Sequence, residues 1–229
     1  MDLNNRFLDD LSAEDLRRLR PHLHTVELAR GQVLDEPETR VSGVYLPVNC
    51  IISVITVMNN GAQVETRTIG CEGGYGLLHA LGSPVAYERM EVQLEGRAWR
   101  LALAALAAAA ADSRSLTDAI VRDGQATILQ ATQSVACNVL HSAEQRLCRW
   151  MLLTHDRVRD DVLPLTQEQL ATKLGVQRTT VTAVASQLQA RGLISYSRGK
   201  IRVLDRPAIE RCACECYAAI QRGVAMIVD

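Results

Sequence analysis

The sequence LTQEQLATKLGVQRTTVTAVASQL, residues 165–188, predicts two short helices joined by a tight turn. Thr166 can cap the first helix, with Gln169 as the reciprocal capping partner, and the glycine at position 175 supplies the left-handed backbone that often ends a helix. The second helix has a core-facing set at helical spacing, namely Val181, Val184, Ala185 and Leu188. Its exposed start is therefore polar and short-chained, and it carries Arg178.

A predicted β-hairpin with a basic tip follows these helices, because two β-biased runs flank Arg198-Gly199-Lys200. Helix, turn, helix and hairpin in this order predict a winged helix-turn-helix, whose second helix reads base edges in the DNA major groove. An arginine fork matches guanine, and hydroxyl and amide groups can contact bases or phosphates. The predicted DNA-binding residues are Thr166, Gln167, Gln177, Arg178, Thr179, Thr180, Thr182, Gln187, Arg198 and Lys200.

The 229 residues are 48% hydrophobic, which is enough for one large or two ordinary domains. Residues 1–141 hold 12 Lys and Arg against 17 Asp and Glu, whereas residues 142–229 hold 13 against 9, so only the second part suits a polyanion. No apolar run reaches the roughly 20 residues of a membrane helix, and the N-terminus lacks the form of a signal peptide. We expect a cytoplasmic protein with no membrane partner.

The first half of the chain changes from helix to short strands and back to helix. Residues 4–20 predict an amphipathic helix. Short β runs separated by turn residues then predict a small antiparallel barrel or roll, at residues 26–28, 33–34, 44–46, 51–57, 64–69, 92–94 and 99–101. Further helices are expected over residues 102–111, over 116–138, from Ser142 onward, and from Asp205 through 212–217.

The helix over 116–138 carries a seam of apolar or small residues at alternating spacings of three and four, a heptad pattern. The seam consists of Val121, Gly124, Ile128, Ala131, Val135 and Asn138. We interpret it as the interface of a parallel two-helix dimer, with packing on the chain's own barrel as the alternative. The predicted parts are a sensor domain over 1–112, a dimerisation helix and hinge over 113–141, and a DNA-binding domain over 142–229.

In this order the elements resemble the cyclic-AMP receptor protein/Fnr (Crp/Fnr) family of bacterial transcription regulators. Residues 165–187 and the wing carry the resemblance most specifically, and CNVLHSAEQRL (137–147), THDR (154–157) and ACECY (213–217) are similar to a subgroup without an assigned effector. The resemblance implies an α+β protein with a cyclic-nucleotide-binding-like N-terminal β-roll (jelly roll), a long dimerisation helix and a C-terminal winged helix-turn-helix. It also implies a homodimer that binds a palindromic operator in double-stranded DNA and works with RNA polymerase.

The sequence departs in two places from the founding member of the Crp/Fnr family. The recognition helix of the founding member reads DNA with an Arg, a Glu and a second Arg. In this chain Arg178 matches the first of these, but Thr179 and Ala183 stand at the other two positions, so we expect a different operator. The nucleotide pocket of the founding member uses a ribose-binding Glu and a phosphate-binding Arg, where this chain has a leucine and an arginine shifted by one. We expect no cyclic AMP and no cofactor; the residues at the corresponding pocket are Tyr75, Gly76, Leu77, Arg89 and Thr132.

Seven scattered cysteines are expected to be reduced thiols. On one continuous helix Cys212 and Cys216 share a face while Cys214 points elsewhere, so no metal site is predicted from this run. Nor is an Fnr-type iron–sulfur cluster expected, because the first cysteine is Cys50. The candidates for a thiol switch are Cys137, Cys214 and Cys216; the alternative is that they pack as small buried groups.

The function predicted from these patterns is that of a dimeric, sequence-specific DNA-binding transcription regulator. The sequence shows no Ser/His/Asp, metal or phosphate-loop constellation, so we do not expect an enzyme. Two alternatives stay open: an effector sensor that acts through protein–protein contacts, and a regulator that responds to thiol oxidation.

Overall fold

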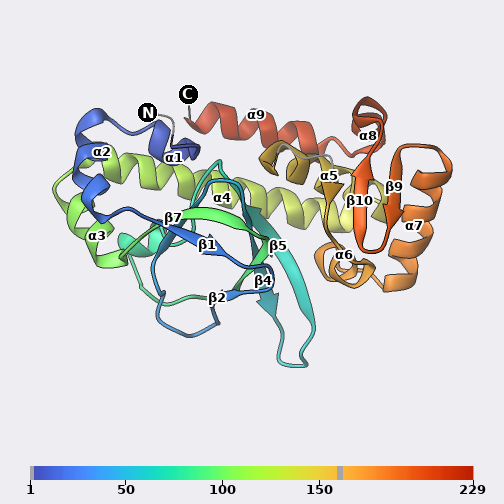
Figure 1. Cartoon of the computed structure of the whole chain (residues 1–229), viewed down its shortest axis with the longest axis horizontal. Helices are drawn as coiled ribbons and strands as arrows, with labels where there is room; N and C mark the ends of the chain where they lie inside the picture. Colours follow the sequence, from blue (N-terminus) through green and yellow to red (C-terminus); the bar gives the residue numbers. More distant parts are fainter. Residues whose placement is uncertain (1–2, 159–161, 229) are drawn as a thin grey trace.

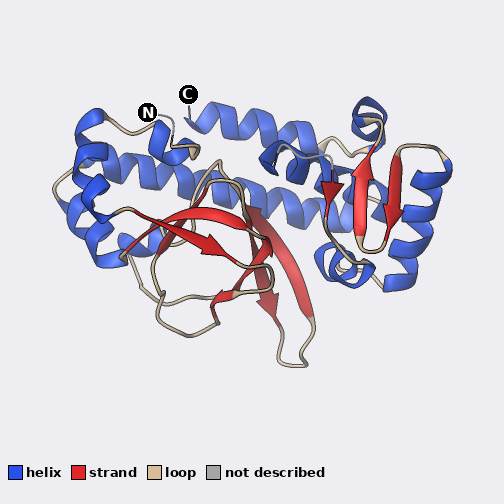
Figure 2. Ribbon diagram, in the orientation of Figure 1, coloured by secondary structure: helices blue, strands red, loops and turns tan. Residues whose placement is uncertain are grey.

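The computed structural model describes residues 3–158 and 162–228. A β-roll lies beneath one half of the long helix α4 (Arg114–Leu140), and a domain of helices with a small sheet lies at the far end of that helix (Figure 1). Both regions combine helices with antiparallel sheets, and no parallel strand pair occurs among the described residues (Figure 2), which confirms the predicted α+β class. No helix in the described ranges combines the length and apolar character needed to cross a lipid bilayer.

The N-terminal segment contains three short elements rather than the one helix expected over 4–20. These are α1 (Arg6–Asp9), α2 (Ala13–Leu19) and the 3-10 helix η1 (Arg20–His22). The Asn5 side chain accepts a hydrogen bond from the Leu8 N–H, and Ser12 accepts one from the Asp15 N–H. Each cap starts its own helix, so the segment divides between residues 9 and 13.

The roll consists of two antiparallel sheets that face each other. One contains β1 (His24–Leu28), β7 (Gly96–Leu101) and β3 (Val44–Pro47), and the other contains β2 (Val33–Asp35), β6 (Arg89–Leu94), β4 (Ile51–Val57) and β5 (Gln63–Ile69). Buried side chains such as Ile52, Val54 and Met90 fill the space between them. The predicted strands are confirmed, with β4 matching the expected 51–57. A 3-10 turn, η2 (Leu78–Ala80), follows β5.

Helices connect the roll to the C-terminal domain. The alanine-rich α3 (Leu103–Ala111) leads into α4, whose last residues precede a break at His141. Helix α5 (Ala143–Val158) then begins as predicted: the Gln145 N–H donates to Ser142 Oγ at 3.3 Å, and the Ser142 N–H donates to Gln145 Oε1 at 3.0 Å. This reciprocal pair satisfies backbone donors at the helix start.

The C-terminal domain has its own core and its own sheet. Its elements are α5, β8 (Val162–Leu163), α6 (Gln167–Leu174), α7 (Arg178–Ala190), β9 (Ile194–Ser197), β10 (Lys200–Val203) and α8 (Arg206–Cys212). The three strands pair in the order β8-β10-β9, and leucines from α5, α6 and α7 form the centre of the core.

The single final helix predicted from Asp205 is wrong. Helix α8 ends at Cys212 because Ala213 adopts an extended backbone, and a new helix, α9 (Cys216–Val228), starts after Glu215. Helix α9 returns along α4, so that the C-terminus lies near the N-terminus (Figure 1). A Cβ on Gly223 would lie 2.4 Å from Leu129 Cδ2, so a side chain at position 223 would require the end of the Leu129 side chain to move.

The two domains meet at a buried ion pair between α6 and the outer face of the roll. Lys173 Nζ lies 2.5 Å from Glu65 Oε2, and the two side chains are only 8% and 4% exposed. Lys173 also donates to Ser53 Oγ at 2.9 Å, and the indole N–H of Trp150 donates to the second Glu65 oxygen at 3.2 Å. We call Lys173 and Glu65 the interdomain ion pair. It fixes the first helix of the predicted DNA-binding motif on the sensor domain.

Candidate nucleic-acid interface

Helix α6 begins and ends as its sequence predicts. Thr166 Oγ1 accepts the Gln169 N–H at 3.3 Å, and Gln169 Oε1 accepts the Thr166 N–H at 3.0 Å, which completes a capping box. Gly175 lies in the left-handed region with φ 60° and ψ 40°, and its N–H caps the last turn. Gly175 thus ends α6 and begins the short turn that leads into α7.

Helix α7 presents a polar N-terminal end to solvent. Its core-facing residues are those predicted, since Val181, Val184, Ala185 and Leu188 are all buried. Arg178 is its first residue and is exposed, as are Thr179 and the preceding Gln177. Thr180 is half-buried, whereas Thr182 and Gln187 are exposed farther along the helix. The Thr182 hydroxyl donates to Gln167 Oε1 at 2.9 Å, which ties α7 to α6.

The wing has the tight turn that its sequence predicts. Ser197 of β9 pairs with Lys200 of β10, and the two residues between them have positive φ, 49° for Arg198 and 71° for Gly199. Two successive positive φ values define the turn that matches the twist of a two-stranded ribbon. Arg198 and Lys200 are both exposed, so the tip of the wing is basic.

The helix ends and the wing together form one shallow concave surface. Arg178, Arg198 and Lys200 form no ion pair with any other residue in the described ranges, so their charges face solvent. Unpaired, exposed cations near exposed amides and hydroxyls suit a phosphate backbone. The residues that line this surface are Thr166, Gln167, Glu168, Arg178, Tyr196, Ser197, Arg198 and Gly199.

Only some residues of the predicted heptad seam on α4 are exposed and available to a second copy of the helix. Val121, Ile128 and Val135 follow one another at seven-residue intervals and are 42%, 61% and 67% exposed. Ala131 is half-buried, and Asn138 accepts a hydrogen bond from Arg146 at 3.2 Å. Gly124 has a different partner from the one predicted: it is buried, and a Cβ there would lie 2.8 Å from the Leu78 side chain of the chain's own roll.

The residues predicted for an effector pocket are not among those that line the cavities beside α4, although the Tyr75 ring contacts His79, which does. Tyr75 and Leu77 are buried in the cores of the sensor domain, because their apolar surface packs between the strands and helices there, and Gly76 approaches the backbone of Gly43. Arg89 pairs with Glu36 at 3.1 Å. Thr132 is exposed, with its hydroxyl bonded to carbonyls of its own helix.

A cavity between the roll and α4 is lined instead by other side chains, among them Arg67, His79, Tyr87, Thr127 and Ile128. Arg67 also lines a second cavity, which reaches α1 and α9. Burial lowers the pKa of Arg67, and this guanidinium has no hydrogen bond or ion pair to another described residue. Arg67 was not predicted as a site residue because it lies within a predicted strand. The signal that could have indicated it is an arginine in a mostly uncharged β run.

Asp123 lies on α4 and lines the second cavity, and its pKa leads us to expect that the stability of the folded protein depends on pH. Burial raises its pKa to about 7 from an ordinary value of 3.8; the nearby Arg67 opposes the change, Glu72 adds to it, and the Gly74 N–H opposes it. The folded protein keeps a proton that the unfolded chain loses, so stability from this group is full below pH 3.8 and is lost as the pH rises through about 7.

The comparison that checks this is the Asp123→Asn variant, which mimics the protonated form at every pH. We expect the stability of the unmodified protein relative to this variant to fall by at least about 1 kcal/mol between those two pH values, since one pKa unit corresponds to about 1.4 kcal/mol. Urea unfolding at several pH values measures the difference. Parallel stability curves for the two proteins would show that Asp123 is ionised throughout.

The candidate redox cysteines lie together. The Sγ atoms of Cys137 and Cys214 are 3.5 Å apart, and Cys216 is beside them with His141, a residue that sequence analysis did not select. The hydrogen bond between Cys137 and Cys214 lowers the pKa of Cys214, and the same bond together with burial raises the pKa of Cys137. The signal for His141 was its position four residues after Cys137 at a helix end.

Comparisons with known proteins agree with this geometry. The Crp-like helix-turn-helix domain matches residues 145–212. Similar solved structures include a Crp/Fnr-family transcriptional regulator from Eubacterium rectale (17% identity, TM-score 0.70, covering 89% of this chain and 95% of that one) and FixK2 from Bradyrhizobium japonicum (16%, 0.70, 84% and 98%). A third is the c-di-GMP-responsive regulator CLP of Xanthomonas campestris (15%, 0.65, 85% and 100%). The comparison with curated proteins gave no match.

The C-terminal domain is therefore a winged helix-turn-helix of the Crp type, attached to a β-roll by a long helix. The chain as a whole has the fold of the Crp/Fnr transcription regulators.

Proposed function

We propose that this protein is a sequence-specific, DNA-binding transcription regulator that works as a homodimer. The observation that carries the proposal is the exposed, unpaired Arg178 at the start of α7, next to a wing whose tip carries Arg198 and Lys200. An arginine there can reach guanine in the major groove while the wing contacts phosphates. The match of residues 145–212 to the Crp-like domain supports the same role.

The exposed stripe on α4 supports the dimer. Val121, Ile128 and Val135 are apolar, exposed and one heptad apart, which is the arrangement that pairs two parallel helices. A twofold axis along α4 would place two copies of α7 on one face of a palindromic operator. Regulation from such a site involves RNA polymerase, which is the partner we expect at the promoter.

The cavity beside α4 is the proposed place of effector recognition. Arg67 is half-buried there and forms no hydrogen bond or close ion pair with a described residue; Glu88, Asp123 and Glu72 interact with it only at longer range. Its guanidinium donors are therefore free to bind an anionic group. Cyclic AMP is not the proposed effector. Leu77, which is buried, stands where cyclic-AMP-binding relatives have the ribose-binding carboxylate, and Arg89 forms an ion pair with Glu36 instead of facing a ligand phosphate.

Selection of bound sequences from a random duplex pool tests the regulator directly. A palindrome with half-sites about one helical turn apart is the expected result for a dimer. Repeating the selection with cyclic AMP, cyclic di-GMP and an oxidant asks which condition changes the outcome. An operator obtained only in one condition would identify the signal, and no enrichment in any condition would contradict sequence-specific binding.

Replacing Arg178 with alanine should relax sequence preference and cost about 1–3 kcal/mol of binding free energy on the selected operator. The reason is that the guanidinium is the long donor at the start of α7 and has no partner within the described protein. Competition binding against random duplex measures the specificity. Lys200→Ala is the matched control, because loss of a phosphate contact should weaken both duplexes equally. Equal loss on both duplexes for the Arg178 variant would argue against base reading.

A further inference from the structure

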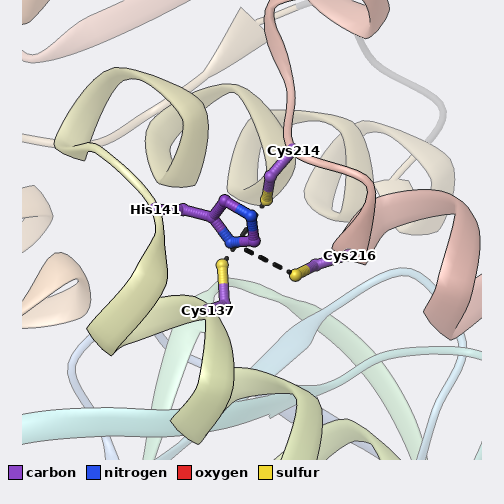
Figure 3. Close-up of side chains that lie close together, drawn as sticks. All are labelled: Cys137, His141, Cys214 and Cys216. Carbon is purple, nitrogen blue, oxygen red and sulfur yellow. Dashed lines mark hydrogen bonds between the residues drawn. The ribbon is translucent and has the colours of Figure 1, made fainter.

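Four potential metal ligands meet where the long helix ends (Figure 3). Cys137 lies in the last turn of α4 and His141 is its C-terminal cap, whereas Cys214 lies in the break between α8 and α9 and Cys216 is the first residue of α9. Their ligand atoms all lie within 4.8 Å of one another. The three thiols are buried together as a small cluster of their own. Side chains from two segments some seventy residues apart in sequence thus point at one centre.

The spacing of these atoms fits one small ion. Sγ of Cys137 lies 3.5 Å from Sγ of Cys214, and Sγ of Cys216 lies 3.5 Å from Nδ1 of His141. With a Zn–S bond of about 2.3 Å and a Zn–N bond of about 2.0–2.1 Å, tetrahedral zinc separates two sulfurs by about 3.8 Å and a sulfur and a nitrogen by about 3.6 Å. An iron–sulfur cluster needs a wider cage, because its own irons and sulfides lie between the cysteines.

The surroundings orient the ligands toward the centre. Nε2 of His141 lies 3.1 Å from Oε2 of Glu215, an arrangement that directs the Nδ1 lone pair at the thiols. A carboxylate behind a histidine is the usual outer partner of a zinc-bound imidazole. The amide Nε2 of Gln133 donates to Sγ of Cys216 at 3.0 Å, and an N–H donor at this position would stabilise a thiolate. Each of these bonds is already in place in the protein.

We propose that Cys137, His141, Cys214 and Cys216 bind one Zn²⁺ ion. All four positions of the tetrahedron are filled by protein atoms, so the site is structural rather than catalytic. Binding displaces to solvent the protons that the thiols carry. The ion connects the end of α4 to the start of α9 and so holds the Crp-type domain on the long helix. The proposal does not depend on what DNA, if any, the domain binds.

Metal analysis of the full chain purified with Zn²⁺ tests the site. One zinc ion per chain is expected for the unmodified protein, with loss in Cys216→Ser. The matched control is Cys212→Ser, because Cys212 lies four residues before Cys216 but contacts Arg191 instead of the cluster. Substitution with Co²⁺ should give the visible absorption of a tetrahedral thiolate complex in the unmodified protein and the control, but not in Cys216→Ser. Added Zn²⁺ should raise the Tm of the same two proteins only.

A milder variant covers the case in which Cys216→Ser fails to fold. Glu215 is exposed, so Glu215→Gln should keep the fold and lower zinc affinity about 10–100-fold, since it weakens only the support behind His141. Any of these results would overturn the proposal: no bound metal in the unmodified chain, zinc retained at full affinity in both the Cys216 and Glu215 variants, zinc lost in Cys212→Ser, or iron and sulfide in place of zinc. A Cys137–Cys214 disulfide in the protein as isolated would do the same.

Discussion

Replacing Lys173 with methionine is expected to lower the free energy of unfolding by about 3–5 kcal/mol, the cost of leaving one partner of a buried ion pair alone. The ammonium is 2.5 Å from Glu65 Oε2, and neither side chain has appreciable contact with water. Methionine fills the space of the lysine stem but supplies no charge. Glu65 would then be an uncompensated carboxylate between α6 and the roll.

Urea unfolding of two further variants separates charge from packing. Adding Glu65→Gln to Lys173→Met should restore most of the lost stability, because the amide is neutral and its oxygen can still accept from Trp150. Lys200→Met, an exposed lysine in the same domain, should change stability little. If Lys173→Met costs no more than Lys200→Met, the interdomain ion pair contributes nothing measurable.

Replacing Leu188 with alanine should cost about 2–5 kcal/mol, because a fully buried leucine leaves a cavity when it is shortened. Leu188 lies on the inner face of α7, in the core shared by α5, α6 and the small sheet. Its loss loosens the helix that carries Arg178, so operator binding should weaken as well.

Leu204→Ala provides the comparison for Leu188. Leu204 is in the same domain but 55% exposed, so its truncation should stay within about 0.5 kcal/mol of the unmodified protein. Tryptophan fluorescence during urea unfolding reports both variants, since Trp150 lies in this core. Similar losses for the two leucines would show that the core does not pack as described.

Local signals predicted local structure well in this chain. Thr166 and Gln169 form the capping box, Gly175 takes the left-handed backbone, and the four apolar positions of α7 are buried. Each feature depends on residues within about four positions of one another, where side-chain type decides the backbone directly. The strand over residues 51–57 was also predicted correctly, because its many β-branched residues favour a strand.

Contacts between distant segments could not be predicted in the same way. The sequence around Glu65 does not indicate that Lys173 is its partner, nor does the sequence around Lys173 indicate Glu65, because the ion pair forms only when α6 lies on the roll. The surroundings of the predicted pocket residues were hidden for the same reason: Leu77 packs into the core, and Arg89 pairs with the distant Glu36. A continuous helix was assumed through Cys212–Cys216, so the break that turns Cys214 and Cys216 toward His141 went unseen.

The return of α9 along α4 has a mechanical consequence. The Crp-type domain is joined to α4 once through the backbone at His141 and a second time through α9, which lies back along the same helix. Because the domain is attached to α4 at two points, it cannot rotate freely about either attachment. Reorientation of α7 relative to the roll must therefore carry α4 along with it, or slide α9 past the close contact at Gly223.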